Sequence, residues 1–454
     1  MPTKHRAALL GAGPAGFYTA AALLKAGLAV DLYDALPTPY GLVRAGVAPD
    51  HPKIKTVTRT YDKTAAHEDF RFFGRVKLGE DVSREDLLAR YHAIVYAVGT
   101  RLDNRLGIPG EDLPGSHAAT EFVAWYNGHP DYADREFDLS CERAVVIGNG
   151  NVAIDVARML ALDPDELAVT DTADHAIDAL SRAQVKEVVM LGRRGPAQAA
   201  FTNPELRELK DLQRAHVVVD PGDVELDEHS SAWLDGDEAH TTARRNVEIL
   251  REFCDRDPGD HVHRIVMRFL RSPVEILGEE RVKGVRVAVN QLQPGDDGRL
   301  RAVITGETEV IECGLVLRSI GYRGEPIDGV PFDERSGLIP NAGGRVTGDD
   351  GEPLPGEYAV GWIKRGPSGV IGTNKKDAAD TVARILEDRD AGALNDPAED
   401  GDAEAWLREH VPQLVTWEGW ERIDAHERRL GEPLGRPRVK IVDLEEMGRI
   451  ASGG

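Results

Sequence analysis

Two glycine-rich strings in the chain have the spacing that binds the pyrophosphate of a dinucleotide. Residues 11–16 read GAGPAG, and residues 148–153 read GNGNVA. In such a string the first glycine makes a tight turn and the second lets the backbone approach the pyrophosphate. The third position lets a helix pack closely on a strand. The amino end of that helix then offers free N–H groups and a positive dipole to the phosphates.

The two strings differ in the residues that end the following apolar strand. Asp34 lies 18 residues after Gly16, where an acid accepts the ribose hydroxyls. Arg193 and Arg194 stand at the corresponding place after the second string. An acid there would repel a 2′-phosphate, whereas paired guanidinium groups bind it bidentately. We therefore expect NADP(H) at the second string; the alternative for the arginines is solvated charge at a strand end.

These strings need strands and helices to position them, and the apolar pattern predicts two βαβ units. Residues 6–10 and 28–33 are apolar strands that flank an Ala/Leu-rich helix. Residues 144–147 and 187–191 are the corresponding strands of the second unit, with a helix over 154–162. Two dinucleotide sites in one chain suggest two cofactors that meet. NADP(H) donates a hydride but does not split it into single electrons. A flavin accepts a hydride and can release its electrons one at a time, so FAD is the economical choice for the first site.

Two further apolar strands, residues 93–99 and 315–321, are natural crossing points between domains. We predict an α/β fold with two Rossmann-like domains, in the manner of glutathione reductase. The FAD-binding domain comprises residues 1–106 and 325–454, with a C-terminal extension, and the NADP-binding domain, 107–324, is inserted into it.

Composition excludes several other classes of protein. The chain of 454 residues is 41% apolar, enough for two cores, and its formal net charge of −23 argues against nucleic acid or an anionic membrane as partner. No apolar stretch is long enough to span a bilayer, and the short apolar run near the N-terminus is a buried strand. We expect a soluble protein in the cytoplasm or an equivalent reducing space. The acidic stretches 163–184, 220–240 and 387–404 are expected to be solvated loops or linkers, with helical structure from Trp406 onward.

The number and spacing of the cysteines limit which electron acceptor the flavin can have. Cys141, Cys254 and Cys313 lie far apart and form no CxxC. This spacing argues against a disulfide framework, an internal iron–sulfur cluster and the vicinal dithiol of flavin disulfide reductases. A separate protein that accepts one electron at a time is the simplest acceptor for electrons that leave the flavin. An FAD monooxygenase is the alternative kind of enzyme. A non-catalytic NADPH sensor is the alternative from another class.

Longer strings resemble the adrenodoxin reductase family. They are residues 37–44 (PTPYGLVR), 46–53 (GVAPDHPK), 192–196 (GRRGP), 198–202 (QAAFT) and 361–376 (GWIKRGPSGVIGTNKK). The likeness runs from the first strand to about residue 385 and resumes near Trp406. It is similar above all to the mycobacterial NADPH–ferredoxin reductases of that family. The resemblance implies a monomeric, reversible ferredoxin–NADP⁺ reductase. Such an enzyme moves a hydride from NADPH to FAD and single electrons to a ferredoxin-type iron–sulfur protein, without a metal of its own.

The resemblance also implies site residues. Those for FAD are Gly11, Gly13, Pro14, Ala15, Gly16, Asp34, Leu42, Lys77, Trp362, Gly369, Val370 and Ile371. Those for NADP(H) are Asn149, Gly150, Asn151, Val152, Arg193, Arg194 and Glu205, with Gly369 near the nicotinamide. The family's usual Gln in the second string is Asn149 here, a mild departure.

The family's active-site histidine–carboxylate couple falls on His51 and Glu208. Glu205 and Glu208 are three residues apart on a short helix predicted to begin after Pro204, so both could face one site. One would hold the nicotinamide ribose, and the other would pair with His51 to orient the nucleotide and hold or move a proton. A purely structural His–Glu pair is the alternative.

An acidic ferredoxin needs a local basic patch on this acidic chain. The candidates are Lys53, Lys55 and Arg59, and, on a predicted helix, Arg244, Arg245 and Arg251. Ordinary solvated charge is the alternative for both groups.

Overall fold

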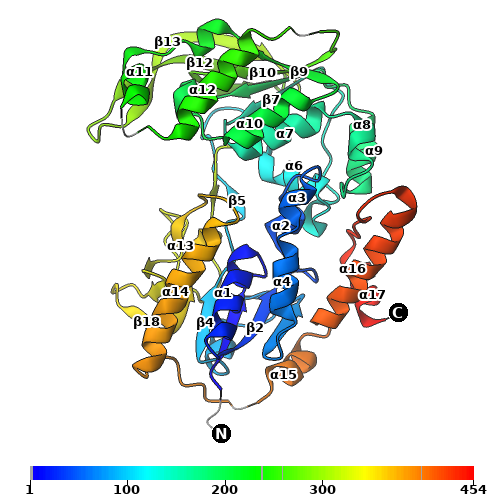
Figure 1. Cartoon of the computed structure of the whole chain (residues 1–454), viewed down its shortest axis with the longest axis vertical. Coiled ribbons are helices and arrows are strands. Elements are labelled where there is room, and N and C mark those ends of the chain that lie inside the picture. Colours follow the sequence, from blue (N-terminus) through cyan, green and yellow to red (C-terminus); the bar gives the residue numbers. More distant parts are fainter. Residues whose placement is uncertain (1–3, 237–238, 258, 400, 454) are drawn as a thin grey trace. The chain divides into compact units, whose positions relative to one another are not determined.

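The structure is a computed structural model that describes residues 4–236, 239–257, 259–399 and 401–453 (Figure 1). The chain divides into two compact units. Unit 1 comprises Met1–Asn104 and Gly321–Gly454, and unit 2 comprises Arg105–Ile320. The first segment of the predicted FAD-binding domain ends at residue 106, two residues beyond Asn104. The predicted NADP-binding domain ends at residue 324, four residues beyond Ile320. Each unit is described by itself below.

Unit 1 is built on a seven-stranded sheet with the order β16-β17-β18-β4-β1-β2-β3. The strands from β18 to β3 are parallel, and β16 and β17 extend the sheet in antiparallel pairing. A separate two-stranded pair joins β5 and β15. The strands are β1 (Arg6–Leu10), β2 (Ala29–Asp34), β3 (Phe70–Gly74), β4 (Ala93–Tyr96), β5 (Leu102–Asp103), β15 (Tyr322–Arg323), β16 (Asn341–Ala342), β17 (Arg345–Thr347) and β18 (Pro353–Ala359).

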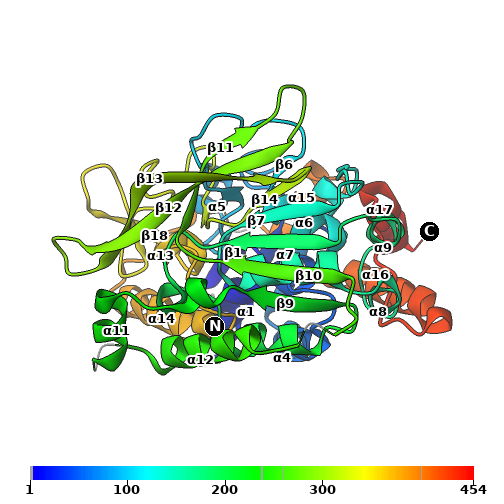
Figure 2. The same cartoon turned by 90° about the horizontal axis from the view of Figure 1, so that it is seen from above.

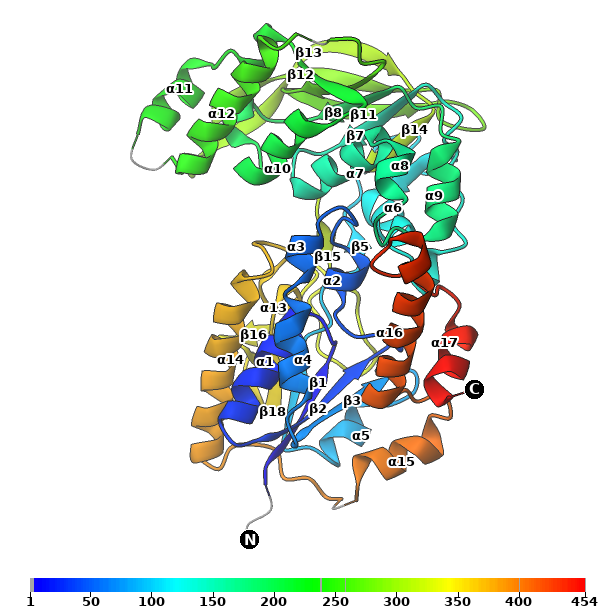
Figure 3. The ribbon, with the colours of Figure 1, turned by 45° about the vertical axis from the view of Figure 1, so that its right-hand side comes forward.

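Helices surround this sheet. They are α1 (Pro14–Lys25), α2 (Leu42–Ala45), α3 (Pro52–Lys55), α4 (Thr58–Ala65), α5 (Arg84–Leu88), α13 (Trp362–Arg365), α14 (Thr373–Asp390), α15 (Ala403–His410), α16 (Trp417–Gly431) and α17 (Leu444–Ser452). Helices α1 and α14 lie side by side although they are far apart in sequence (Figures 1 and 3). Trp417 and Trp420 of α16 contact the ring of Tyr40, so the C-terminal segment packs on the core of this unit. The prediction of helical structure after Trp406 is confirmed.

Unit 2 contains a six-stranded parallel sheet with the order β6-β14-β7-β8-β10-β9, part of which is visible in Figure 2. Its strands are β6 (Ser116–Ala118), β7 (Arg143–Ile147), β8 (Glu187–Leu191), β9 (Ala215–Val219), β10 (His263–Arg268) and β14 (Leu315–Arg318). A second, antiparallel sheet joins β11 (Arg271–Leu277), β12 (Gly284–Pro294) and β13 (Leu300–Glu312). The helices of the unit are α6 (Ala119–Tyr126), α7 (Asn151–Ala161), α8 (Pro164–Leu167), α9 (Asp174–Ser181), α10 (Asn203–Glu208), α11 (Glu228–Asp235) and α12 (Thr241–Cys254).

Strand order in both units is that of open, doubly wound α/β sheets, so the predicted fold class is confirmed. The prediction of loops at the acidic stretches is wrong in part. Residues 163–184 contain α8 and α9, and 220–240 contain α11, because each stretch also carries apolar residues such as Leu180 and Leu234 that become buried. Residues 237, 238 and 400 of these stretches lie outside the described part of the chain. Among the described residues, no helix combines the length and the apolar character that crossing a bilayer requires.

Candidate nucleotide-binding sites

The first glycine turn connects β1 to α1 and has the shape of a phosphate cradle. Gly11 has a φ of +110°, and a Cβ added there would lie 2.5 Å from the carbonyl oxygen of Ala97. A Cβ on Gly16 would lie 2.1 Å from the carbonyl oxygen of Gly11. A Cβ on Gly13 would meet no atom within 4 Å. Packing therefore requires the first and third glycines, whereas the second leaves open space for a ligand at the amino end of α1.

Asp34 ends β2 and holds this turn. Its Oδ2 accepts a hydrogen bond from the Ala12 N–H at 2.7 Å, and its Oδ1 accepts one from the Leu36 N–H at 2.9 Å. Burial raises the pKa of the Asp34 carboxyl, while these two hydrogen bonds act in the opposite direction. Each carboxylate oxygen has a second lone pair, so Asp34 can also accept ribose hydroxyls.

Two segments distant in sequence lie against the same turn. Tyr40, at a φ of +84°, donates its N–H to the Ala12 carbonyl at 2.8 Å. Leu42 follows it and is 50% exposed. Gly361 has a φ of +78°, and a Cβ added there would lie 2.7 Å from the Cβ of Ala15. The fold thus brings the predicted residues at 11–16, 34 and 42 to one place in unit 1, beside Gly361, which directly precedes Trp362.

The other predicted residues of unit 1 lie in α13, in the segment before α14 and after β3. Trp362 stacks on Tyr322 with ring centroids 5.8 Å apart. Val370 lies between Gly369 and Ile371, just before α14, and is 61% exposed. Its N–H donates a hydrogen bond to the hydroxyl oxygen of Thr373, the first residue of α14. Lys77 follows β3, and its ammonium pairs with Glu80.

The second glycine turn connects β7 to α7 and repeats the first. Gly148 has a φ of +141°, and a Cβ there would lie 2.1 Å from the Ser319 carbonyl oxygen, whereas a Cβ on Gly150 would meet nothing within 4 Å. Ala153 occupies the third position and is fully buried. Val152, beside it, is part of the first turn of α7. The open second position again lies at the amino end of a helix.

The string at residues 198–202 is bound to this turn. The Asn149 carbonyl accepts the Ala200 N–H at 3.0 Å, and Asn151 Oδ1 accepts the Thr202 N–H at 2.8 Å. Thr202 directly precedes α10, which carries Glu205 in its first turn. The turn and α10 are therefore held together within unit 2.

Arg193 and Arg194 follow β8, as the sequence predicts. Arg193 is exposed and Arg194 is half-buried. No acidic side chain in the described ranges forms an ion pair with either guanidinium. Burial lowers the pKa of Arg194, and the charge of Arg193 lowers it further. An anion bound here would relieve this repulsion.

These geometries can be compared with known proteins. A family model described as pyridine nucleotide-disulphide oxidoreductase matches residues 5–190. The NADPH-ferredoxin reductase FprA of Mycobacterium tuberculosis is 50% identical over 461 residues, which cover 98% of this chain and 99% of that protein. The mitochondrial NADPH:adrenodoxin oxidoreductase of Salvelinus fontinalis is 43% identical over 467 residues, covering 99% and 91%.

The chain belongs to the adrenodoxin reductase-type family of NADPH–ferredoxin reductases. A solved structure of Mycobacterium tuberculosis FprA in complex with NADPH has a TM-score of 0.94 to this chain at 49% identity, covering 99% of this chain and 100% of that one. The resemblance read from the sequence is confirmed.

The residues predicted as the catalytic couple of this reductase family lie in different units. His51 is 8% exposed and precedes α3 in unit 1. Glu208 ends α10 in unit 2, where its Oε2 accepts a hydrogen bond from Nη1 of Arg158 at 2.8 Å. Arg158 is buried on α7 and also bonds Asp155 at 2.8 Å. Sequence reasoning missed Arg158: its spacing of three from Asp155 on a helix signals their ion pair, but it does not signal the contact with Glu208. The pairing of His51 with Glu208 stays a prediction.

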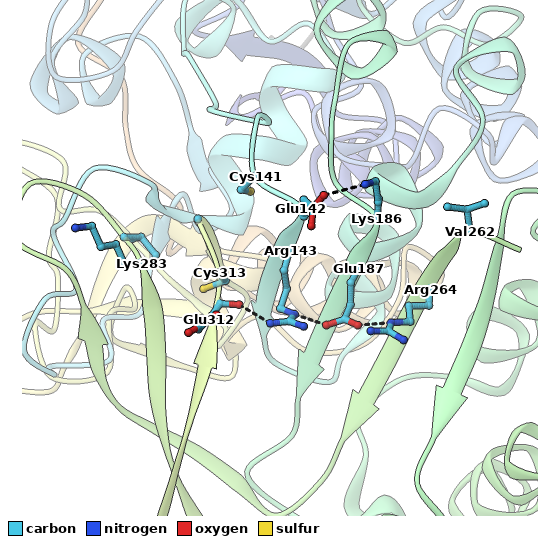
Figure 4. Close-up of a pocket in the computed structure, with 12 residues that line it drawn as sticks. Cys141, Glu142, Arg143, Lys186, Glu187, Val262, Arg264, Lys283, Glu312 and Cys313 are labelled. Carbon is cyan, nitrogen blue, oxygen red and sulfur yellow. Dashed lines mark hydrogen bonds and ion pairs between the residues drawn. The ribbon is translucent and has the colours of Figure 1, made fainter.

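A hollow elsewhere in unit 2 of this reductase is a separate feature (Figure 4). It has a volume of about 640 Å³ and lies at the amino ends of β7, β8 and β10. Glu187 joins Arg143 to Arg264 across its floor, and Cys141 and Cys313 line one side. Open α/β sheets bind their ligands at the carboxyl ends of the strands, where the glycine turn lies. This hollow is therefore distinct from the nucleotide-binding turn.

Proposed function

We propose that the chain is an FAD-dependent ferredoxin–NADP⁺ reductase. It moves a hydride from NADPH to FAD and passes single electrons, reversibly, to a ferredoxin-type iron–sulfur protein. The observation that carries this function is the presence of two glycine turns, each with an open second position, in a chain that aligns over its full length with NADPH-ferredoxin reductases.

FAD is assigned to unit 1 because its turn ends in a carboxylate. Residues 11–16 would receive the pyrophosphate, and Asp34 the ribose hydroxyls. Leu42, Trp362 and residues 369–371 would enclose the ring system. Lys77, which lies shortly after β3, is proposed as a further FAD contact.

NADP(H) is assigned to unit 2 because its turn is followed by two arginines without an acidic partner among the described residues. Residues 149–152 would receive the pyrophosphate, and Arg193 and Arg194 the 2′-phosphate. Glu205, in the first turn of α10, would hold the nicotinamide ribose.

When bound, the flavin supplies the chemistry that couples hydride transfer to single-electron transfer. The chain's own residues bind, orient and shield the reactants. The stacked rings of Trp362 and Tyr322 would exclude water from one side of the bound flavin. His51 is proposed to hold or move a proton at its imidazole, with Glu208 as its carboxylate partner. The Arg158 ion pair orients Glu208 for that role.

The acceptor is proposed to be a separate iron–sulfur protein, because the chain's three cysteines are free and form no cluster motif. Free cysteines are also what a reducing compartment such as the cytoplasm maintains.

Stopped-flow spectroscopy under anaerobic conditions tests this function. The purified protein is mixed with NADPH and then with a panel of oxidised ferredoxins. We expect rapid loss of the flavin absorbance, followed by its recovery on addition of a ferredoxin, faster than oxygen alone restores it. Recovery that needs oxygen and an organic substrate would instead identify a monooxygenase. A colourless protein that still binds NADPH would identify a sensor.

A further inference from the structure

The loop that carries the two arginines, residues 192–194, is fixed by hydrogen bonds to all three of its carbonyl groups. The Gly192 carbonyl accepts the Arg271 N–H at 3.0 Å, and the Arg194 carbonyl accepts the Leu270 N–H at 3.1 Å. The Arg193 carbonyl accepts a hydrogen bond from the side-chain Nδ2 of Asn290 at 2.8 Å. We call this segment the arginine loop. Its backbone is held by Leu270, which directly precedes β11, and by Arg271 of β11 and Asn290 of β12, rather than by its own neighbours in sequence.

Asn290 is the one side chain in this set of contacts. It lies on β12 and is 4% exposed. Its Nδ2 also donates to the Ser272 hydroxyl oxygen at 2.8 Å, so both amide hydrogens are used. Its Oδ1 is buried without a hydrogen-bond partner in the described part of the chain. A buried amide with an unsatisfied oxygen is unfavourable for folding, so packing alone does not account for an asparagine here.

Leu270, which contacts both the arginine loop and Asn290, has a strained backbone conformation. Its φ of +54° lies in the left-handed region, which a leucine rarely adopts. In this conformation its N–H bonds the Arg194 carbonyl, and its C=O accepts the Asn290 N–H at 2.8 Å. Strain of this kind persists where surrounding contacts fix the backbone, and it is concentrated at ligand sites.

The arginine loop therefore presents two guanidinium groups from a rigid backbone. Bidentate recognition of a phosphate depends on the position of the guanidinium plane, so a shift of the Arg193 carbonyl would move the donors away from the anion. The rest of the nucleotide, bound at residues 149–152, would be little affected.

We propose that Asn290, acting through the Arg193 carbonyl, is a positioning residue that sets the preference of this chain for a 2′-phosphorylated nucleotide. This inference rests on the proposed function of Arg193 and Arg194. It goes beyond that function by assigning a specificity role to the β11–β12–β13 sheet, which carries no glycine motif.

Direct binding measurements on the full-length, flavin-loaded protein test the proposal. The Asn290→Leu variant keeps the side-chain size but removes the donor. By isothermal titration calorimetry we expect its Kd for NADP⁺ and for adenosine 2′,5′-bisphosphate to rise about fivefold, the effect of one lost hydrogen bond. Its Kd for NAD⁺ should change by less than about twofold. Asn290→Ser, a smaller change, provides the same comparison if the leucine variant does not fold.

Asn127→Leu is the matched control. Asn127 is equally buried in unit 2, and its Nδ2 bonds the Val123 carbonyl at 3.1 Å at the end of α6. We expect this variant to leave the ratio of the two Kd values unchanged. A parallel loss of NADP⁺ and NAD⁺ affinity in the Asn290 variants, or no loss of either, would overturn the proposal.

The Arg193→Ala/Arg194→Ala variant separates this inference from the proposed function. If the double variant loses the preference for NADP⁺ and the Asn290 variants keep it, only the positioning role is wrong. If the double variant also keeps the preference, the phosphate assignment itself is wrong, and the role of Asn290 falls with it.

Discussion

The arginine pair after β8 concentrates positive charge in a chain whose net charge is −23. Neither guanidinium has an acidic partner among the described residues, so no acidic side chain there neutralises the two positive charges. A dianion such as a 2′-phosphate suits this arrangement better than a ribose hydroxyl does. We therefore propose that this pair sets the choice between NADPH and NADH at the level of single residues.

Replacing both arginines by alanine tests this choice. For the Arg193→Ala/Arg194→Ala variant we expect the KM for NADPH to rise about 10- to 100-fold, because charge-assisted hydrogen bonds to the phosphate are lost. The KM for NADH should change little, since NADH has no 2′-phosphate. Steady-state kinetics with both nucleotides measures the effect, and equal losses for the two would refute the phosphate role.

At this scale, residues at fixed local spacings could be predicted from the sequence, and partners distant in the chain could not. The glycines, Asp34 and the arginine pair follow from the geometry of a βαβ unit. The partner of Glu208, Arg158, lies 50 residues away and depends on how α7 packs on α10. Tyr322 beneath Trp362 has no local signal either, because tertiary packing alone brings the two rings together.

At the scale of elements, the two strand–turn–helix units are alike: in each, the second glycine of the turn has open space beside it. Gly13 and Gly150 both cap a helix, and neither would clash with its surroundings if it carried a Cβ. The space beside each is where a pyrophosphate would approach the backbone.

Alanine at these two positions should therefore separate the two cofactors. We expect Gly13→Ala to fold but to lose most of its FAD, and Gly150→Ala to keep its FAD and bind NADP⁺ at least about tenfold more weakly. Absorbance at the flavin band and calorimetric titration with NADP⁺ measure the two effects. Circular dichroism checks the fold. Loss of flavin from the Gly150 variant would contradict the assignment of one cofactor to each unit.

Helix α16 is joined to the segment around α2 by a buried charge cluster. Glu427 is fully buried; its carboxylate accepts two hydrogen bonds from Arg44, at 2.5 and 2.8 Å, and one from Arg438 at 3.0 Å. Burial raises the pKa of Glu427, but the charges of Arg44 and Arg438 outweigh it, so the pKa lies below its ordinary value of 4.5. The cluster holds the segment that carries Leu42 against the C-terminal helices.

Glu427→Gln should lower the free energy of unfolding at neutral pH by about 3–5 kcal/mol, because it leaves buried guanidinium charge without its partner. A folded-state pKa below the unfolded value gives stabilisation that is present above pH 4.5 and is lost as the pH falls through the folded-state pKa. The difference between variant and wild type should therefore shrink in acid.

Urea unfolding followed by tryptophan fluorescence over a range of pH measures this difference. Glu404→Gln on α15 is the control. Its partner Arg408 is mostly exposed, and an exposed pair contributes less than about 1 kcal/mol. A difference that stays constant down to about pH 3 would show that the charge of Glu427 is not the cause.

The sequence predicted the strands beside the glycine turns to within about two residues, because their apolar runs are short and bounded by glycine or charge. It did not predict α8, α9 or α11. In those stretches the acids dominate the composition, and a few apolar residues at helical spacing, buried by tertiary contacts, decide the structure.

At the scale of the whole molecule, net negative charge opposes the approach of an acidic ferredoxin, so a local basic patch has to overcome it. The structure distinguishes the two candidate groups. On α12, Arg244 bonds the carbonyl groups of Leu234 and Gly236, and Arg245 pairs with Glu248. Lys53 and Arg59, on α3 and α4, are exposed. We therefore favour the group at α3 and α4 as the docking patch.

Ionic strength tests this docking patch. We expect the second-order rate of ferredoxin reduction to fall with added salt, because screening weakens a local attraction over distances of about 10 Å. Lys53→Glu/Arg59→Glu should lower the low-salt rate about tenfold and reverse the slope. Arg245→Glu is the control and should have little effect. A rate that rises with salt in the wild type would mean that the global repulsion dominates.

The most direct measurement for the whole account is an anaerobic titration of the purified protein with NADPH, followed through the flavin absorbance. We predict one bound FAD per chain, bleached by one equivalent of NADPH and restored by two equivalents of an oxidised ferredoxin, since each acceptor takes one electron. A protein that is isolated without a chromophore and cannot be reconstituted with FAD would contradict the account.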